Sequence, residues 1–234
     1  MDVVEPAQAA DATRRARVRI ASGSDRYADP WHPFARTSAL LAEILDDAGF
    51  IVEIVDDVEA AMTLLGGVDL LVVNAGDPWR ADDGGVPAPD DSVSGLAEAL
   101  DRGIGILAMH SAVSSLRDYP EWAAAIGAIW VPGLSFHPPS DLAAIRGVAA
   151  LDGIEIESFH VFDERYCRLQ IIGSSRVVAE HGAQGVTYPT AWVREHGAAR
   201  IAVDVLGHDE RSYDSAGHRA LIVALARWSA RRSD

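Results

Sequence analysis

Lysine is missing from this chain, and all 20 of its basic residues are arginines. Without a side-chain amine, Schiff-base catalysis has no nucleophile, and a Walker A phosphate loop, which requires a lysine, is excluded. Acidic residues outnumber arginines, so the formal net charge is −15. Such a surface repels phosphate backbones and anionic lipid headgroups. The composition therefore argues against nucleic-acid binding and against membrane binding.

Cys167 is the single cysteine, which excludes an intramolecular disulfide and a C-x-x-C zinc site. This usage is typical of a reducing compartment, so we expect a cytoplasmic protein. No stretch approaches the 18 apolar residues of a membrane span. The first residues lack the apolar core of a secretory signal. We expect residues 1–15 to form a disordered N-terminal segment and residues 16–232 to form a single domain.

Apolar runs alternate with helical patterns in the first half of the chain. Strands are expected at 17–21, 50–55, 69–74 and 104–109, and helices at 34–48, 93–102 and 120–127. This alternation indicates parallel βαβ units. Further strands are expected at 153–162, 168–172, 176–179, 191–194 and 200–205, before a closing helix at 218–231. The sequence predicts an α/β domain with a mostly parallel sheet and some antiparallel strands in its second half.

One predicted loop, at 77–92, is long and rich in Pro, Gly and Asp. It leaves the carboxyl end of the strand at 69–74. Loops of this length in a compact domain often act as lids or binding loops. A surface excursion without a function is the alternative.

Two of the predicted strands end in a histidine with a polar neighbour. The strand at 104–109 leads into His110 and Ser111, and the strand at 200–205 leads into Gly207, His208 and Asp209. Ligands in open α/β sheets bind beyond the carboxyl ends of the strands, so we expect both imidazoles in one crevice. They could act as acid–base groups or as metal ligands. A structural role for His110 and helix capping by Asp209 are the alternatives.

A second group of polar residues follows the strand that ends at residue 162. Strand alternation sends Asp163 and Arg165 to one face and Glu164 and Tyr166 to the other, so this segment could offer a carboxylate and a phenol to a polar ligand. An edge-strand ion pair is the alternative. His32, in the turn between the first strand and the first helix, is also expected at the carboxyl edge. The alternative is that His32 only forms part of the turn that enters the helix.

The remaining histidines and the tryptophans carry weaker signals. For His137, which precedes two prolines, we favour a structural role, and nothing singles out His181, His196 or His218. Aromatic side chains often stack on sugar rings, but a tryptophan is more often part of the core. Both interpretations stay open for Trp31, Trp79, Trp122, Trp130 and Trp192.

Ser111 stands where α/β-hydrolases and class I glutamine amidotransferases carry a nucleophile. Residues 107–112 read Leu-Ala-Met-His-Ser-Ala, without a G-x-S-x-G motif and without a cysteine. Thiolate glutaminase chemistry is therefore excluded at this position. A nucleophilic Ser111 activated by His110 is a weak alternative, because adjacent side chains rarely face each other.

The ordered set of these motifs resembles the ThuA-like family, named after a trehalose-utilisation protein, over residues 18–230. The matching strings are 106–112, 120–122, 162–166, 189–197 and 199–209, with Gly127, Trp130, Arg227 and Trp228. The resemblance implies a class I glutamine amidotransferase-like, flavodoxin-like three-layer α/β/α sandwich without the glutaminase cysteine. It also implies a role in carbohydrate metabolism, especially of keto-sugars handled beside sugar oxidoreductases. Many relatives carry a His-Pro pair upstream of the Asp-Glu-x-Tyr segment, and residues 147–153 lack it.

We therefore expect a protein that acts on or binds a sugar or keto-sugar. The expected catalytic residues are His110, Glu164 and His208, and the expected substrate-binding residues are His32, Ser111, Asp163, Tyr166 and Asp209. The first hypothesis is isomerisation or epimerisation by proton transfer next to a carbonyl. The second is a zinc or manganese enzyme that uses two histidines with Glu164 or Asp163. The third is a non-catalytic sugar-binding module, or one that docks on a partner such as a sugar oxidoreductase. A homo-oligomer is compatible with each hypothesis.

Overall fold

A computed structural model describes residues 14–80 and 86–232 of the chain. The expected disordered segment lies outside the described residues except for Arg14 and Arg15. The helices are α1 Phe34–Asp47, α2 Val58–Thr63, α3 Asp90–Arg102, α4 Trp122–Ile126 and α5 Ala216–Ser229. The strands are β1 Arg17–Ser22, β2 Ile51–Val55, β3 Leu70–Asn74, β4 Gly105–Met109, β5 Ala128–Ile129, β6 Asp141–Gly147, β7 Phe159–Asp163, β8 Gln170–Ile171, β9 Arg176–Ala183, β10 Val186–His196 and β11 Ala199–Asp204. Short 3-10 helices are η1 Asp25–Tyr27, η2 His110–Val113 and η3 Glu210–Asp214.

A nine-stranded sheet, in the order β2-β1-β3-β4-β11-β10-β9-β6-β7, forms the middle of the molecule. The pairs from β2 to β11 are parallel, and the pairs from β11 to β7 are antiparallel. The chain moves from β1 outward to β2 and then returns past β1 to β3, as in flavodoxin-like folds. The predicted fold class is confirmed. The junction of β1 and β3 is the topological switch point at which such folds bind ligands.

Helices cover both faces of the sheet, and this explains why β3 and β4 are buried along their whole length. Leu70 and Val72 pack in the core beneath α1 and α5, whereas Leu71 and Val73 pack in the core beneath α2, α3 and α4. Alternate side chains of a strand point to opposite faces, so a strand between two helical layers has to be apolar at every position.

The structure differs from the local predictions in several details. The strand expected at 153–162 begins only at Phe159, and β6 and α2 were not predicted. In β6 only Ala143 and Ile145 are buried, so its apolar pattern is short and weak. Helix α3 begins at Asp90 rather than residue 93, and acidic residues in its first turn suit the positive end of the helix dipole. The predicted long loop is therefore shorter, and its middle, 81–85, lies outside the described residues.

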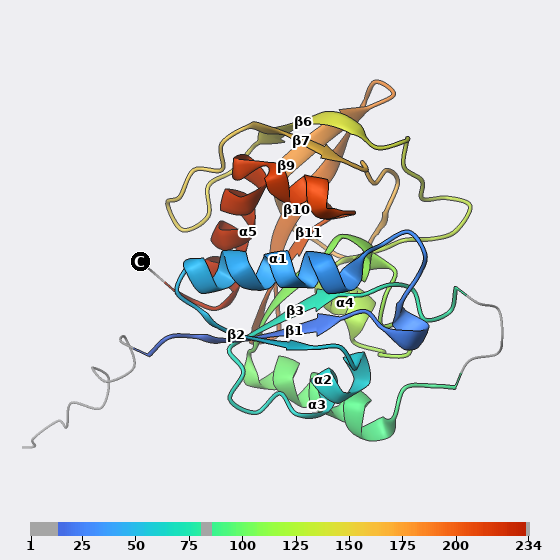
Figure 1. Ribbon diagram of the computed structural model, residues 1–234, viewed down its shortest axis with the longest axis vertical. Helices are drawn as coiled ribbons and strands as arrows, with labels where there is room; N and C mark the ends of the chain where they lie inside the picture. The colour runs from blue at the N-terminus through green and yellow to red at the C-terminus, as the bar shows by residue number, and fades with distance from the viewer. Residues whose placement is uncertain (1–13, 81–85, 233–234) are drawn as a thin grey trace, which may run out of the picture.

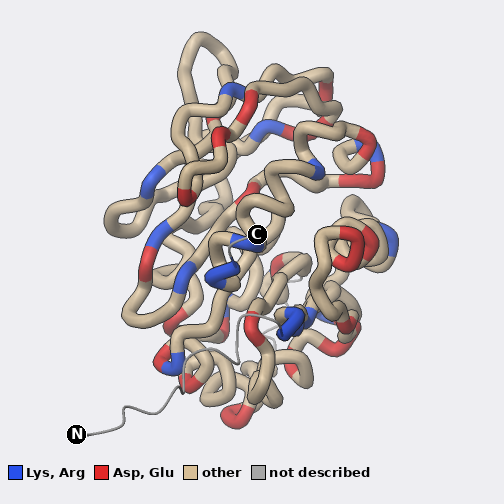
Figure 2. Tube along the Cα trace, turned by 90° about the vertical axis from the view of Figure 1, so that its left-hand side faces the viewer, with Lys and Arg blue, Asp and Glu red and all other residues tan. Residues whose placement is uncertain are grey.

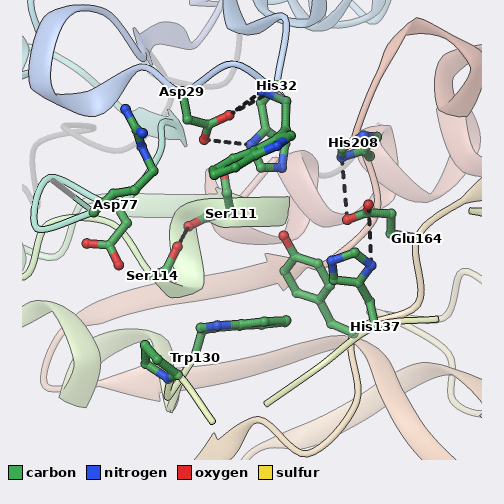
Figure 3. Close-up of a pocket in the computed structure, with 13 residues that line it drawn as sticks. Asp29, His32, Asp77, Ser111, Ser114, Trp130, His137, Glu164 and His208 are labelled. Carbon is green, nitrogen blue, oxygen red and sulfur yellow. Dashed lines mark hydrogen bonds and ion pairs between the residues drawn. The ribbon is translucent and has the colours of Figure 1, made fainter. Parts of the chain in front are cut away.

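Charged residues of both signs are interspersed along the trace in the view of Figure 2. Many form ion pairs across neighbouring elements, such as Arg19 with Glu53 and Arg165 with Asp141. Among the described residues, every helix is too short or too polar to cross a membrane.

Candidate functional site

A cavity of about 460 Å³ opens at the carboxyl ends of the parallel strands. Its walls come from the segments that follow β1, β3, β4 and β11, together with the segments after β5 and β7. The cavity thus lies at the edge of the sheet where the sequence predicted a crevice. Its lining includes His32, Ser111, Glu164, Tyr166 and His208, which are five of the eight expected site residues.

His110 occupies a strained turn between β4 and η2. Its φ angle of 42° is in the left-handed region, which is costly for a residue other than glycine and recurs at functional sites. The buried ring donates from Nδ1 to the carbonyl oxygen of Val205 at 2.8 Å, and its Nε2 accepts from the Tyr166 hydroxyl at 2.9 Å. Burial, reinforced by the neighbouring His32 and His208, lowers the pKa of His110 well below its ordinary value. The ring is therefore neutral at pH 7.

The carboxylate of Asp29 fixes His32 in the turn between η1 and α1. It accepts from His32 Nδ1 at 2.7 Å and from the backbone N–H groups of Trp31 and His32 at 2.9 Å each. Burial raises the pKa of Asp29, but these bonds outweigh it, so the pKa is lowered. The Nδ1–H therefore points at Asp29. The buried Nε2 of His32 has no hydrogen-bond partner among the described residues.

The turn after β11 carries His208 and depends on two residues. Gly207 adopts a φ of 113°, and a Cβ there would lie 2.7 Å from the Tyr213 hydroxyl. The Asp163 carboxylate accepts from the Gly207 N–H at 2.7 Å and from the His208 N–H at 3.3 Å. Asp163 is only 2% exposed and joins the end of β7 to this turn. Burial, with the nearby His32, lowers the pKa of His208 to about 4.

A buried polar network supports Asp163 from behind. The Ser212 hydroxyl donates to Asp163 at 2.5 Å and lies 2.9 Å from His218 Nδ1, while His218 Nε2 lies 3.0 Å from Asp204. Burial lowers the pKa of His218, but Asp204 and Asp163 outweigh it, so the pKa is raised. His218 thus contacts Asp204 directly and Asp163 through the Ser212 hydroxyl. Nothing in the sequence singled out His218, because its partners come from distant segments.

Glu164 lies at the centre of the site. Its carboxylate oxygens are 3.3 Å from His137 Nδ1, 3.4 Å from His208 Nδ1 and 3.7 Å from His110 Nε2. Burial raises the pKa of Glu164, and His137 opposes this effect. Both the carboxyl and the carboxylate form are therefore accessible nearer to neutral pH than for an exposed glutamate. Such a group suits proton transfer.

Sequence reasoning missed His137, for which we favoured a structural role. The available signal was the His-Pro pair itself, which lies at 137–138, further upstream than the 147–153 segment where we looked for it. The side chain lines the cavity, beside Tyr166 at a ring separation of 5.9 Å and Trp130 at 6.0 Å.

The remaining expected residues lie in different places. Ser111 lines the cavity and donates to the Ala75 carbonyl at 3.0 Å, and the described hydrogen bonds do not join it to His110. Asp209 caps η3 through the Arg211 N–H, as the alternative interpretation proposed. His110, Asp163 and Asp209 do not belong to the cavity lining of the described residues; His110 lies behind it, in contact with the lining residues Tyr166 and Glu164.

Aromatic side chains make up part of the cavity wall. Trp130 and Tyr166 lie with ring centroids 4.7 Å apart, and Trp31, which is 61% exposed, stands at the mouth beneath the Arg80 guanidinium. By contrast, Trp122 and Trp192 are buried in the core. Trp79 is exposed, donates to Asp118 and does not belong to the described cavity lining. Of the five tryptophans noted in the sequence, Trp31 and Trp130 therefore remain as candidates for contacting a ligand.

Three histidines and a carboxylate meet in this cavity. One nitrogen each of His32, His110 and His208 and an oxygen of Glu164 lie within 4.8 Å of one another. The three imidazole rings have centroid separations of 4.8 to 5.4 Å. Nitrogen and carboxylate donors at this spacing are compatible with a metal ligand set.

Comparisons with known proteins agree with this architecture. The structure is similar to a protein described as ThuA-like from Parabacteroides merdae (TM-score 0.74, 18% identity, covering 93% of this chain and 90% of that one). A ThuA-like protein from Bacteroides uniformis gives a TM-score of 0.67 at 13% identity, covering 97% and 95%. A β-galactosidase from Halorubrum lacusprofundi gives 0.62 at 13% identity, covering 92% of this chain but 30% of that one.

These structural similarities establish the fold, and a match to a family model identifies the family. A search of curated proteins finds no significant match. The model of the ThuA family, described by trehalose utilisation, matches residues 18–229. Because that match spans almost the whole described chain, the protein belongs to the ThuA family.

Proposed function

We propose that this protein acts on a sugar or keto-sugar derivative bound in the cavity at the carboxyl edge of the sheet. Membership in the ThuA family supports a function related to trehalose utilisation. The observation that carries the more specific proposal is the placement of Glu164 among the imidazoles of His110, His137 and His208. Trp130 and Tyr166 add an aromatic wall, which suits the C–H face of a pyranose.

The proposed reaction is proton transfer next to a carbonyl. Glu164 takes the proton from the carbon adjacent to the carbonyl, and the electron pair of that C–H bond moves toward the carbonyl oxygen to give an enediolate. Return of the proton to the opposite face of the same carbon gives an epimer. Return of the proton to the former carbonyl carbon, with the hydroxyl proton passing from one oxygen of the enediolate to the other, gives an isomer, so neither reaction consumes an oxidant. His110 Nε2 carries a lone pair, because Nδ1–H donates to the Val205 carbonyl, so His110 and His208 would stabilise charge on the oxygen through a cation that they hold.

Solvent exchange of the substrate provides a direct test. We would first use thermal shift to screen trehalose, other sugars and their keto derivatives, with and without divalent metals. A ligand at about 100 times its Kd stabilises a protein by about 2.7 kcal/mol. A stabilising compound is then incubated with the protein in D₂O, and loss of the C–H signal next to the carbonyl is followed by proton NMR. We expect enzyme-dependent exchange.

The matched variants are Glu164→Gln and Glu195→Gln. Glu195 is an exposed glutamate far from the cavity, paired only loosely with Arg200. We expect Glu164→Gln to slow exchange by about 10²-fold or more and Glu195→Gln to leave it unchanged. Binding without exchange in the unaltered protein would refute the catalytic proposal and favour a non-catalytic sugar-binding module.

A further inference from the structure

Lone pairs of three imidazoles converge in the cavity, and two of the rings are locked from behind. His32 donates its Nδ1–H to Asp29, and His110 donates its Nδ1–H to the Val205 carbonyl. Each ring thereby presents an unprotonated Nε2 toward the cavity. Metal-binding histidines show this arrangement, in which a carboxylate or a backbone carbonyl holds the other ring nitrogen and orients the ligand.

Two of the converging nitrogens lack a hydrogen-bond partner. His32 Nε2 and His208 Nδ1 are both buried without a hydrogen-bond partner among the described residues, although His208 Nδ1 lies 3.4 Å from the Glu164 carboxylate. Leaving a buried polar atom unpaired costs about 1–3 kcal/mol, and here two of them face the same carboxylate and the same His110 ring. A structural cluster would pair these atoms with one another. A cation would instead use the lone pairs directly.

We infer that His32, His110, Glu164 and His208 form the binding site of one divalent transition-metal ion of the zinc class. The donor atoms lie within 4.8 Å of one another. A tetrahedral zinc ion with bonds of about 2.0–2.2 Å holds its ligand atoms about 3.3 Å from one another. Side-chain rotations that shift these atoms by about 1 Å would therefore complete the site. Three nitrogens and one carboxylate favour zinc over calcium or magnesium, which prefer oxygen ligands.

Tyr166 would lose its present hydrogen-bond acceptor if a metal bound. Its hydroxyl now donates to His110 Nε2 at 2.9 Å, the lone pair that a metal would take. Metal binding therefore releases the phenol, which can then donate to an oxygen of a ligand or of metal-bound water. Removing the hydroxyl takes away a competitor for His110, so Tyr166→Phe is expected to keep or strengthen metal affinity.

Metal binding at this site does not depend on which sugar the protein binds. The role of the metal in catalysis, however, rests on the proposed function. A metal held at this position would supply a Lewis acid that polarises the substrate carbonyl, and the oxygen of Glu164 that the metal did not use would be left to take the proton. Metal binding is measured without any sugar, so failure of this inference and failure of the proposed function give different results.

The experiment is metal titration of the full chain after dialysis against a chelator. Zn²⁺ binding is measured by calorimetry, and Co²⁺ is added separately so that its visible absorption reports the coordination geometry. We expect one equivalent per chain, with Zn²⁺ and Co²⁺ binding more tightly than Mn²⁺ and much more tightly than Mg²⁺. His32→Gln and His208→Gln should each weaken Zn²⁺ binding by more than about 10-fold, and Asp29→Asn by about 10- to 100-fold.

His181→Gln is the matched control, because His181 is also buried with an unpaired ring nitrogen but lies outside the cluster. Its Zn²⁺ affinity should equal that of the unaltered chain, and circular dichroism should show that every variant is folded. Less than 0.1 equivalent of bound Zn²⁺, or an equal loss of affinity in His181→Gln and His208→Gln, would overturn the inference. Metal binding without any response to sugars would instead count against the proposed function alone.

Discussion

Replacing Asp163 by asparagine tests whether this residue holds the site together or binds a ligand. Its two carboxylate oxygens accept four hydrogen bonds, from the N–H groups of Glu164, Gly207 and His208 and from the Ser212 hydroxyl. Asparagine has nearly the same shape but replaces one oxygen by an NH₂ group. Whichever oxygen is replaced, the new donor faces at least one backbone N–H donor, so the network cannot be restored by flipping the amide.

The expected loss of stability follows from the burial of this network. Hydrogen bonds to a charged group contribute about 1.5–3 kcal/mol each, and replacing either oxygen by NH₂ removes the acceptor of two of these bonds. The negative charge that acts on His218 through Ser212 is lost as well. We expect Asp163→Asn to lower the free energy of unfolding by about 3–5 kcal/mol, or Tm by roughly 10 °C in a chain of this size.

Urea unfolding at pH 7, followed by tryptophan fluorescence, measures this loss. Asp46→Asn is the control, because Asp46 forms an exposed ion pair with Arg15 and should change stability by less than about 0.5 kcal/mol. Suppose Asp163→Asn matches the unaltered chain in stability but loses affinity for a sugar. Asp163 would then contact the ligand, as the sequence alone suggested, and the supporting role argued from the structure would be wrong.

Three further outcomes are expected. Gly207→Ala should lower the free energy of unfolding by about 1–3 kcal/mol, because the new Cβ would meet the Tyr213 hydroxyl. Gly185→Ala is the control: Gly185 has a φ of 76° but open space around it, so this change should cost less. Equal losses in urea unfolding would contradict this account. Burial lowers the pKa of His181 to about 4. As pH falls, His181 is protonated in the unfolded chain before it is protonated in the folded chain, so the folded state loses stability between pH 6.5 and pH 4. A His181→Gln variant should lose about 3 kcal/mol less stability between pH 7 and pH 4. An unchanged dependence of stability on pH would refute this prediction. Trp130→Ala should weaken binding of a confirmed sugar by about 10-fold, by analogy with other aromatic contacts. The side chain also packs against the core, so Tm should fall as well, and circular dichroism must show that the variant is folded. Unchanged affinity in the folded variant would remove the ring from the binding surface.

Some residues of the candidate site could be located from the sequence, and others could not. His110 and His208 were located because each follows an apolar strand, and parallel strands present their carboxyl ends at one edge of the sheet. His137 lies in a loop between prolines, where no periodicity points to a neighbour, and its contact with Glu164 arises only because the segment after β7 returns to the edge of β11. Asp163 looked like a site residue because it adjoins Glu164, yet the alternation of the strand turns it inward.

The sequence by itself determined the α/β class, the parallel first half of the sheet, the absence of a cysteine nucleophile and the edge of the sheet at which the cavity lies. Each of these depends on local periodicity or on residue type, which a chain carries without its tertiary partners. Only the tertiary structure decided which polar residues face the cavity and which support it, because Asp29, Val205 and His218 act through contacts between distant segments. Burial then decided the protonation states of the imidazoles, and burial is a property of packing rather than of any residue taken alone.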